Sequence, residues 1–223
     1  YEDSPKEDVP RAVLLAVGAE RERVEAIARE AGGDVYVAMH NCPHQAVLVG
    51  ERAAADRALE IVRREGLIYE YLTFDRAYHT QLFAPYAGRL RHVFERLTMR
   101  PSTTAAYSCT TAAPYPARPS EIRELMVEHW SRPVEFQRTV ERLYDDGVRI
   151  FIEAGPRGNL TAFVEDILRG RPFCAVPANV QRRSGVTQLN HLVAMVFAHG
   201  LAPSLGVLHE NRIGRHVAWE EPG

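Results

Sequence analysis

Lysine is almost absent from this chain of 223 residues: Lys6 is the only one, and every other basic side chain is an arginine. The arginines are scattered along the chain, which indicates the compositional skew of a GC-rich genome and not a local basic patch. The formal net charge is only −2 at pH 7, so the chain lacks the excess of positive charge that nucleic-acid-binding proteins carry. We therefore expect no nucleic-acid partner.

Cysteines and long apolar runs are also scarce. Cys42, Cys109 and Cys174 are widely spaced and predict no disulfide framework, which favours a reducing compartment. No apolar run approaches the ~20 residues that span a membrane, and no secretory signal peptide is visible. We therefore expect a cytoplasmic protein without a membrane partner, and the hydrophobic content of 46% is typical of an ordinary globular chain.

Residues 11–74 have the pattern of a small α/β subdomain. Apolar runs predict strands at 12–17, 35–39, 45–49 and 67–72, and apolar side chains at helical spacing predict helices at 20–31 and 52–65. The order β-α-β-β-α-β is that of a ferredoxin-like fold. Residues 1–10, which are acidic and contain two prolines, are interpreted as a linker from an upstream half.

Residues 75–185 alternate helices with buried strands, a pattern that predicts a parallel sheet covered by helices. Helices are expected at 83–97, 121–129, 133–146 and 160–168, and strands at 104–109, 148–153 and 173–176. Three strands make a thin sheet, so we expect part of it to be missing from this chain. Residues 186–223 are interpreted as a C-terminal helix, at 186–199, and a linker to a further domain.

His79 stands in a polar turn, bounded by Pro85, between the two blocks. An imidazole titrates near neutrality, so a histidine facing a cleft would suit proton transfer. A histidine that only caps the following helix would have the same sequence pattern. The spacing alone leaves both interpretations open.

Other motifs give weaker indications of chemistry. Residues 155–158 (Gly-Pro-Arg-Gly) lack the lysine and the spacing of a phosphate-binding P-loop. His40, Cys42 and His44 alternate in a turn but supply only three metal ligands, so we predict no metal site. No Gly-x-Ser-x-Gly nucleophile motif occurs, and Ser204 lacks the first glycine of that motif. A serine–histidine enzyme cannot be assembled from this chain alone.

Five segments nevertheless occur together in the order of one known family. They are Ala16–Gly18 with the helix after it, Asn41–Gly50, Ala77–Thr80 with Leu82 and Pro85, Trp130 with Pro133–Phe136, and Phe151–Pro156 with Leu160. Over roughly residues 11–200 the chain resembles the malonyl-CoA:acyl-carrier-protein transacylase family, which includes the acyltransferase domains of polyketide synthases. The resemblance implies the C-terminal portion of such a domain. Residues 75–185 would then belong to an α/β-hydrolase-like subdomain whose nucleophile-bearing half is absent.

The activity that the resemblance implies is a ping-pong acyl transfer. A serine outside this chain would take malonyl from malonyl-CoA and pass it to the phosphopantetheine thiol of an acyl carrier protein, with no cofactor in the chain itself. His79 would be the general base, oriented by the backbone carbonyl of His129. Tyr78 would face the acyl α-carbon and favour malonyl over methylmalonyl, and Asn41 would lie where the small subdomain meets the cleft.

Two alternatives stay open at this point. The chain could be a non-catalytic docking or scaffold fragment for a carrier protein that keeps the fold without the serine. It could also be an unrelated ferredoxin-like binding domain fused to a thin α/β unit. On the leading interpretation the chain alone is inactive, because it holds a base but no nucleophile, and it needs its upstream half as a partner.

Overall fold

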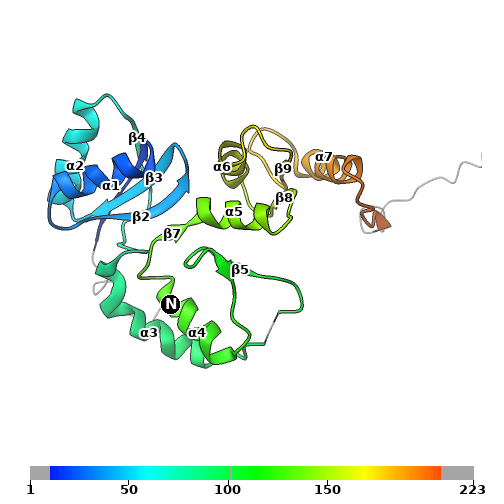
Figure 1. Ribbon diagram of the computed structural model, residues 1–223, viewed down its shortest axis with the longest axis horizontal. Helices are drawn as coiled ribbons and strands as arrows, with labels where there is room; N and C mark the ends of the chain where they lie inside the picture. Colours follow the sequence, from blue (N-terminus) through cyan, green and yellow to red (C-terminus); the bar gives the residue numbers. More distant parts are fainter. Residues whose placement is uncertain (1–10, 101, 207–223) are drawn as a thin grey trace, which may run out of the picture. The chain divides into compact units, whose positions relative to one another are not determined.

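The computed structural model describes residues 11–100 and 102–206 (Figure 1). The predicted upstream linker and most of the predicted C-terminal linker lie outside these residues. The chain forms two compact units: one runs up to Arg149 and includes Ala162–Phe173, and the other holds Ile150–Thr161 and the chain from Cys174 on. The domain boundaries expected from the sequence, at 74/75 and 185/186, stay predictions.

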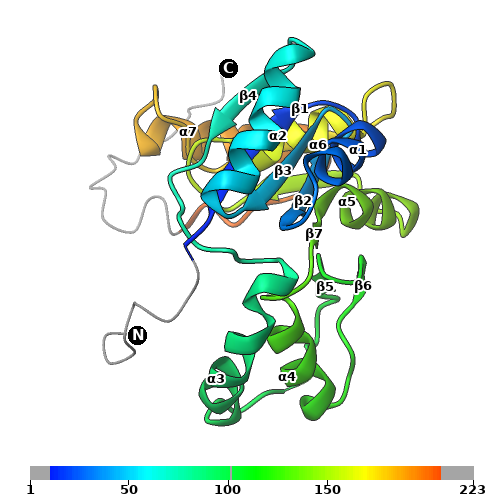
Figure 2. The same ribbon diagram turned by 90° about the vertical axis from the view of Figure 1, so that its left-hand side faces the viewer.

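A five-stranded sheet, with the strand order β4-β1-β3-β2-β7, forms the centre of the first unit. Its first four strands and two helices are β1 Val13–Gly18, α1 Arg21–Ala31, β2 Val35–Cys42, β3 Gln45–Gly50, α2 Arg52–Arg64 and β4 Ile68–Tyr71. These four strands pair antiparallel. Their order along the chain is the predicted β-α-β-β-α-β, and Figure 2 shows α1 and α2 beside the sheet.

Each face of this sheet is buried against a different segment, because successive strand residues point to opposite sides. The cluster on the face covered by α1 and α2 takes from β1 and β3 the side chains of Leu15, Val17, Ala46 and Leu48. The cluster on the other face takes Leu14, Ala16, Val47 and Val49, and it also contains Ala77, with Leu72 and Leu82 at its edge. The second cluster therefore fixes the segment that carries His79 against the sheet.

The fifth strand, β7 Val134–Glu135, was not expected from the sequence. A helix was predicted over 133–146, but α5 begins only at Phe136 and ends at Asp145. Val134 and Glu135 instead pair in parallel with Met39 and His40 of β2. The amide of Glu135 also donates to the carbonyl oxygen of Cys109 at 2.7 Å. Those long-range bonds keep both residues out of the helix, so the predicted start of this helix was wrong.

A helix pair and a small hairpin also belong to the first unit. A 3-10 turn at Gln81–Phe83 leads into α3 Ala84–Glu95, which packs beside α4 Pro119–Glu128 (Figure 1). The strand expected at 104–109 is reduced to β5 Tyr107–Ser108, which pairs antiparallel with β6 Ala113–Pro114. A tight turn with Ala112 at a φ of 51° closes this hairpin. The prediction that the segment joins the parallel sheet was therefore wrong.

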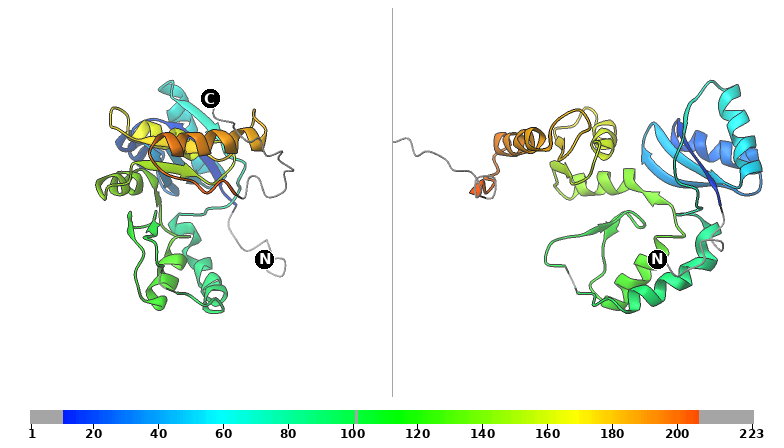
Figure 3. Two further views of the ribbon diagram at one scale, coloured as in Figure 1. Left: turned by 90° about the vertical axis from the view of Figure 1, so that its right-hand side faces the viewer. Right: turned by 180° about the vertical axis from the view of Figure 1, so that it is seen from behind.

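The second unit contains a pair of parallel strands, β8 Ile150–Glu153 and β9 Cys174–Pro177. The helix α6 Asn159–Ile167 lies between them in sequence, with its residues from Ala162 on in the first unit, and α7 Gly185–Ala198 follows β9 (Figure 3). Gln188 of α7 donates to the carbonyl oxygen of Pro177 at 2.7 Å. The parallel sheet thus has two strands among the described residues, and the prediction of three was wrong. No helix in the described ranges is both long and apolar enough to cross a bilayer.

Candidate active site

His79 occupies a tight turn in a backbone conformation that is uncommon for non-glycine residues. Its φ is 62°, in the left-handed region that costs a non-glycine residue roughly 1–2 kcal/mol. On one side of it Ala77 is fully buried in the core of the sheet. On the other side the hydroxyl of Thr80, also buried, donates to the carbonyl oxygen of Ala77 at 2.7 Å. The turn is therefore fixed on both sides of the histidine.

Two consecutive main-chain carbonyls bind His79. Its amide donates to the carbonyl oxygen of Trp130 at 2.8 Å, and its ring nitrogen Nδ1 lies 2.8 Å from the carbonyl oxygen of His129. A carbonyl can only accept, so the proton of the neutral ring is on Nδ1. This tautomer leaves Nε2 as the nitrogen that can take a proton from another group.

The surroundings of His79 favour its neutral form. Burial lowers the pKa of His79, and the hydrogen bond to the His129 carbonyl raises it in part. Burial also lowers the pKa of His129, and the nearby His79 lowers it further. The two imidazole rings meet edge to face with their centroids 4.7 Å apart. Both shifts favour the uncharged form of the rings, and it is in this form that His79 can act as a base.

His129 itself is held at three points. It caps the C-terminus of α4, where its amide donates to the carbonyl oxygen of Leu125 at 3.0 Å. Its ring nitrogen Nδ1 lies 2.8 Å from the hydroxyl of Thr110, and its carbonyl oxygen accepts from His79. The residue that orients His79 is thus connected to the β5–β6 hairpin as well as to its own helix.

Tyr78 packs in an aromatic cluster beside the histidine. Its ring centroid lies 5.3 Å from that of Phe83 and 5.5 Å from that of Trp130. The indole of Trp130 is also nearly parallel to the His79 ring, at 6.4 Å and an interplanar angle of 12°. The cluster, which includes residues of α3 and α4, gives Tyr78 a packing role. The role in which Tyr78 faces an acyl group stays a prediction.

Asn41 lies at the end of β2, apart from the histidine pair in its bonding. Its side-chain amide donates to the amide oxygen of Gln45 across the turn of the hairpin, at 2.9 Å. The preceding residue, His40, is paired with Glu135 of β7. The position of Asn41 relative to the 129–135 segment is therefore set through the sheet, and its predicted place at the cleft stays a prediction.

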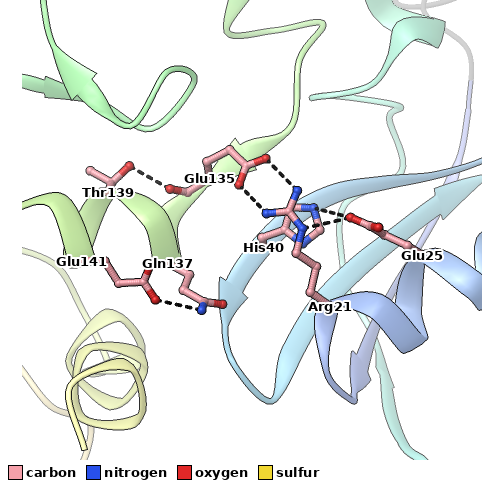
Figure 4. A network of polar contacts seen from close by, with 7 residues as sticks. All are labelled: Arg21, Glu25, His40, Glu135, Gln137, Thr139 and Glu141. Atoms are coloured by element: carbon pink, nitrogen blue, oxygen red, sulfur yellow. Dashed lines mark hydrogen bonds and ion pairs between the residues drawn. The ribbon is translucent and has the colours of Figure 1, made fainter.

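A network of charged side chains strengthens this link between β2 and β7 (Figure 4). Arg21, the first residue of α1, donates to Glu135 at 3.0 Å and to Glu25 at 2.9 Å. The Nε2 atom of the buried His40 lies 3.9 Å from Glu25. Burial lowers the pKa of His40, and the positive charge of Arg21 lowers it further. The network ties the stretch just after the two carbonyls to the first helix of the sheet subdomain.

The three residues considered as metal ligands have different partners. His40 lies against Glu25, whereas Nδ1 of the exposed His44 lies 2.9 Å from the carboxylate of Asp166. Burial raises the pKa of Cys42 to about 11, which keeps its thiol protonated. Among residues 11–100 and 102–206, no three His, Cys, Asp or Glu side chains are arranged to hold a metal ion.

Sequence reasoning missed two parts of this site. Thr110 is a small polar residue in a hairpin turn, and no local pattern marks it as a partner of His129. Arg21 and Glu135 are separated by 114 positions, so only the folded structure brings them together. In the sequence, Arg21 stands in the first turn of a helix and Glu135 just after a Pro-Val pair, and neither position indicates that the two side chains form an ion pair.

The fold and this histidine define a mixed α/β protein with a candidate general base held by main-chain carbonyls. The sequence matches the acyl transferase domain family over residues 7–207, which is most of the chain, and the protein belongs to that family.

Three known proteins show how this chain relates to the family. Polyketide synthase GfsA of Streptomyces halstedii is 30% identical over 191 residues, which cover 84% of this chain and 2% of the synthase. The malonyl CoA-acyl carrier protein transacylase of Bacillus subtilis (strain 168) is 28% identical over 167 residues, which cover 74% of this chain and 52% of the transacylase. The solved acyltransferase domain from the second module of the salinomycin polyketide synthase matches with a TM-score of 0.81 at 26% identity, over 95% of this chain and 50% of its own. The chain thus spans about half the length of the transacylase and of the solved domain.

Proposed function

We propose that this chain is the histidine-bearing C-terminal portion of a polyketide synthase acyltransferase domain, which transfers malonyl from malonyl-CoA to an acyl carrier protein. The observation that carries the proposal is the hydrogen bond between Nδ1 of His79 and the carbonyl oxygen of His129, because it leaves Nε2 available as a base. The choice of substrates is supported by the relative that is a malonyl CoA-acyl carrier protein transacylase. The family to which the chain belongs supports the reaction type.

In the proposed reaction His79 moves one proton in each half. A serine hydroxyl attacks the thioester carbonyl of malonyl-CoA while Nε2 of His79 takes the hydroxyl proton, and His79 then returns that proton to the departing CoA sulfur. The malonyl group is left as an ester on the serine. The phosphopantetheine thiol next attacks this ester, His79 takes the thiol proton, and the serine oxygen receives it as the ester bond breaks. The Nδ1 bond to His129 strengthens each time the ring is protonated.

The proposal places the serine outside these 223 residues. No Gly-x-Ser-x-Gly motif occurs in them, and they span about half the length of the transacylase relative. The nucleophile-bearing half is then also a folding partner, because it would pair with the two-stranded parallel sheet. The exposure of Ile152 on β8, at 49%, is consistent with such a partner.

We assign Tyr78 and Asn41 to the substrate side of this site. Tyr78 directly precedes His79, and its ring is fixed by Phe83 and Trp130, so it can present a rigid wall to the acyl α-carbon. One methyl group excluded by such a wall changes specificity by about 10–200-fold. Asn41 is assigned to the edge of the cleft, because β2 is paired to the strand that follows the two carbonyls.

The test uses the coding sequence extended upstream from Tyr1 until it includes a candidate serine. The extended protein and the 223-residue chain are each mixed with malonyl-CoA and a phosphopantetheinylated carrier protein, and every component is followed by intact mass. We expect a malonyl ester on the serine of the extended protein, its transfer to the carrier, and no adduct on the chain alone. A stable acyl adduct on the chain alone would contradict the proposal. Binding of the carrier without any acyl transfer would favour the scaffold alternative.

A further inference from the structure

The side chain of His129 is bound by a residue that the proposed reaction does not use. Thr110 lies in the turn of the β5–β6 hairpin, is 4% exposed, and places its hydroxyl oxygen 2.8 Å from Nδ1 of His129. We propose that Thr110 is a positioning residue for His79, which it holds in place through His129. The catalytic meaning of this inference rests on the proposed function, whereas the geometric part can be tested without it.

A continuous line of hydrogen bonds connects the hairpin to His79. The amide of Thr110 donates to the hydroxyl oxygen of Ser108 at 3.1 Å, so the turn itself is braced, and Ser108 is also buried. The hydroxyl of Thr110 then binds the His129 ring, and the carbonyl of His129 binds the His79 ring. Each partner along this line is at least half buried. A displacement of Thr110 would consequently reach His79 through two contacts.

His129 is a position at which a side-chain anchor matters. It is the residue that caps the C-terminus of α4, where carbonyls lack the next helical amide that would normally fix their direction. Its peptide also leads directly to Trp130, whose carbonyl accepts from the amide of His79. A rotation of residue 129 would therefore disturb both bonds to His79 together. Hydrogen bonds prefer angles above about 150° and weaken steeply below about 120°, so a rotation of this peptide weakens the contacts that orient the ring.

A purely structural role for Thr110 predicts a different result. Loss of a buried hydroxyl leaves its partner unsatisfied and lowers stability wherever it occurs. Thr161 provides the matched control, because it is also buried and its hydroxyl donates to Glu153 at 2.8 Å, far from the two histidines in sequence. Thr110→Val and Thr161→Val remove the same atom with the same change of shape. Only Thr110→Val should alter His79.

The experiment reads the two ring nitrogens of His79 by NMR in ¹⁵N-histidine-labelled protein, both in the 223-residue chain and in the upstream-extended polypeptide. His79→Gln assigns the signals. In the unsubstituted protein we expect the neutral ring to carry its proton on Nδ1. In Thr110→Val we expect a mixture of both tautomers and a lower pKa of His79, because the carbonyl bond that raises this pKa is weakened. Thr110→Ser should keep the original signals, and so should Thr161→Val.

Kinetics in the extended polypeptide give the second readout. General-base catalysis contributes about 10²–10⁴-fold, so misorientation of the base in Thr110→Val should cost on the order of tenfold in kcat/KM at the pH plateau. The acid limb of the pH profile should move to lower pH, following the pKa of His79. We expect Thr110→Ser and Thr161→Val to stay within about threefold of the unsubstituted enzyme with an unmoved limb, since neither removes the bond to His129.

A second variant keeps the inference testable if Thr110→Val fails to fold. His129→Phe removes the same hydrogen bond from the other side and keeps the backbone carbonyl and most of the ring volume. It should reproduce the change at His79, and the double variant should be no worse than either single one. Unchanged His79 signals in a folded Thr110→Val or His129→Phe protein would overturn the inference. Altered signals in a protein that transfers no acyl group, even unsubstituted, would leave it standing and would overturn the proposed function instead.

Discussion

The amide of His79 donates to the carbonyl oxygen of Trp130 at 2.8 Å, and this bond helps to hold a non-glycine residue at a φ of 62°. The same two residues stack their rings nearly in parallel. Trp130 thus supports His79 through both its main chain and its side chain. Strained backbone of this kind persists only where neighbouring contacts enforce it, and it concentrates at functional sites. The strain itself can be measured.

Substitution of His79 by glycine should leave a more stable protein than substitution by alanine. Glycine adopts a positive φ without penalty, whereas alanine pays roughly 1–2 kcal/mol. Both variants should lose acyl transfer in the extended enzyme by on the order of 10² or more. Denaturant titrations of the two variants give the comparison. His92, exposed in α3, is the control, because there the alanine variant should be more stable than the glycine variant by about 1 kcal/mol. The same order at both positions would contradict the strain argument.

Tyr78→Ser should relax the preference for malonyl over methylmalonyl units in the extended enzyme. The ratio of kcat/KM values is expected to fall by about 10-fold or more, since one methyl group in a shaped pocket is worth about 1–3 kcal/mol. Some loss of stability is also expected, because the ring packs on Phe83 and Trp130. Tyr78→Phe is the control and should keep both the preference and most of the stability. If Tyr78→Ser lowers the melting temperature without changing the preference, then Tyr78 is a packing residue only.

The ion pair between Arg21 and Glu135 should contribute more to stability than an exposed pair does. Glu135 is only 12% exposed at its side chain, and Arg21 reaches it with 37% exposure, so solvent screens this pair less than a surface pair. A double-mutant cycle with Arg21→Gln and Glu135→Gln should give a coupling of about 1 kcal/mol or more. The exposed pair Arg52–Asp56, at 3.5 Å, is the control and should give about 0.3–0.5 kcal/mol. Equal couplings would show that the network adds nothing beyond a surface contact.

The free energy of unfolding should fall as the pH is lowered from 7.5 to 5. Burial lowers the pKa of three histidines, His40, His79 and His129, in the folded protein. The unfolded chain then binds more protons below its own histidine pKa of about 6.5, so acid favours unfolding by about 1.4 kcal/mol per pH unit for each such proton. His40→Gln removes one of these histidines, so it should reduce the slope of the unfolding free energy against pH by up to about 1.4 kcal/mol per pH unit. A free energy of unfolding that rises as the pH is lowered toward 5 would contradict this prediction.

The sequence predicted the elements of residues 11–74 well because their apolar runs and helical spacing are long enough to show a period. It failed at Val134–Glu135 and at residues 104–109 for opposite reasons. Val134 and Glu135 form a strand through two residues only, and Pro133 before them is equally suited to begin a helix. In the 104–109 segment a tight turn pairs the chain locally, whereas β propensity alone cannot choose between a local and a distant partner.

The candidate site was predictable only in part. The family resemblance predicted that the backbone carbonyl of His129 orients His79, and the structure puts that carbonyl oxygen 2.8 Å from Nδ1 of His79. The catalytic roles of both residues stay predictions. The left-handed backbone of His79, the stacking of Trp130 and the bond from Thr110 all depend on tertiary contacts between segments far apart in sequence. No period or motif could have indicated them.

The pairing of β8 with β9 has a consequence for the way the chain opens in solution. A two-stranded sheet is marginal by itself, and a parallel pair forms only after the whole crossover between Glu153 and Cys174 has been ordered. β1 and β3, by contrast, are central strands of the larger sheet and are nearly fully buried. Amide protons of β8 and β9 should therefore exchange with deuterium through local opening, well before those of β1 and β3. Local opening would then occur in the β8–β9 sheet, which carries Glu153, while the five-stranded sheet that packs against the His79 segment stays folded.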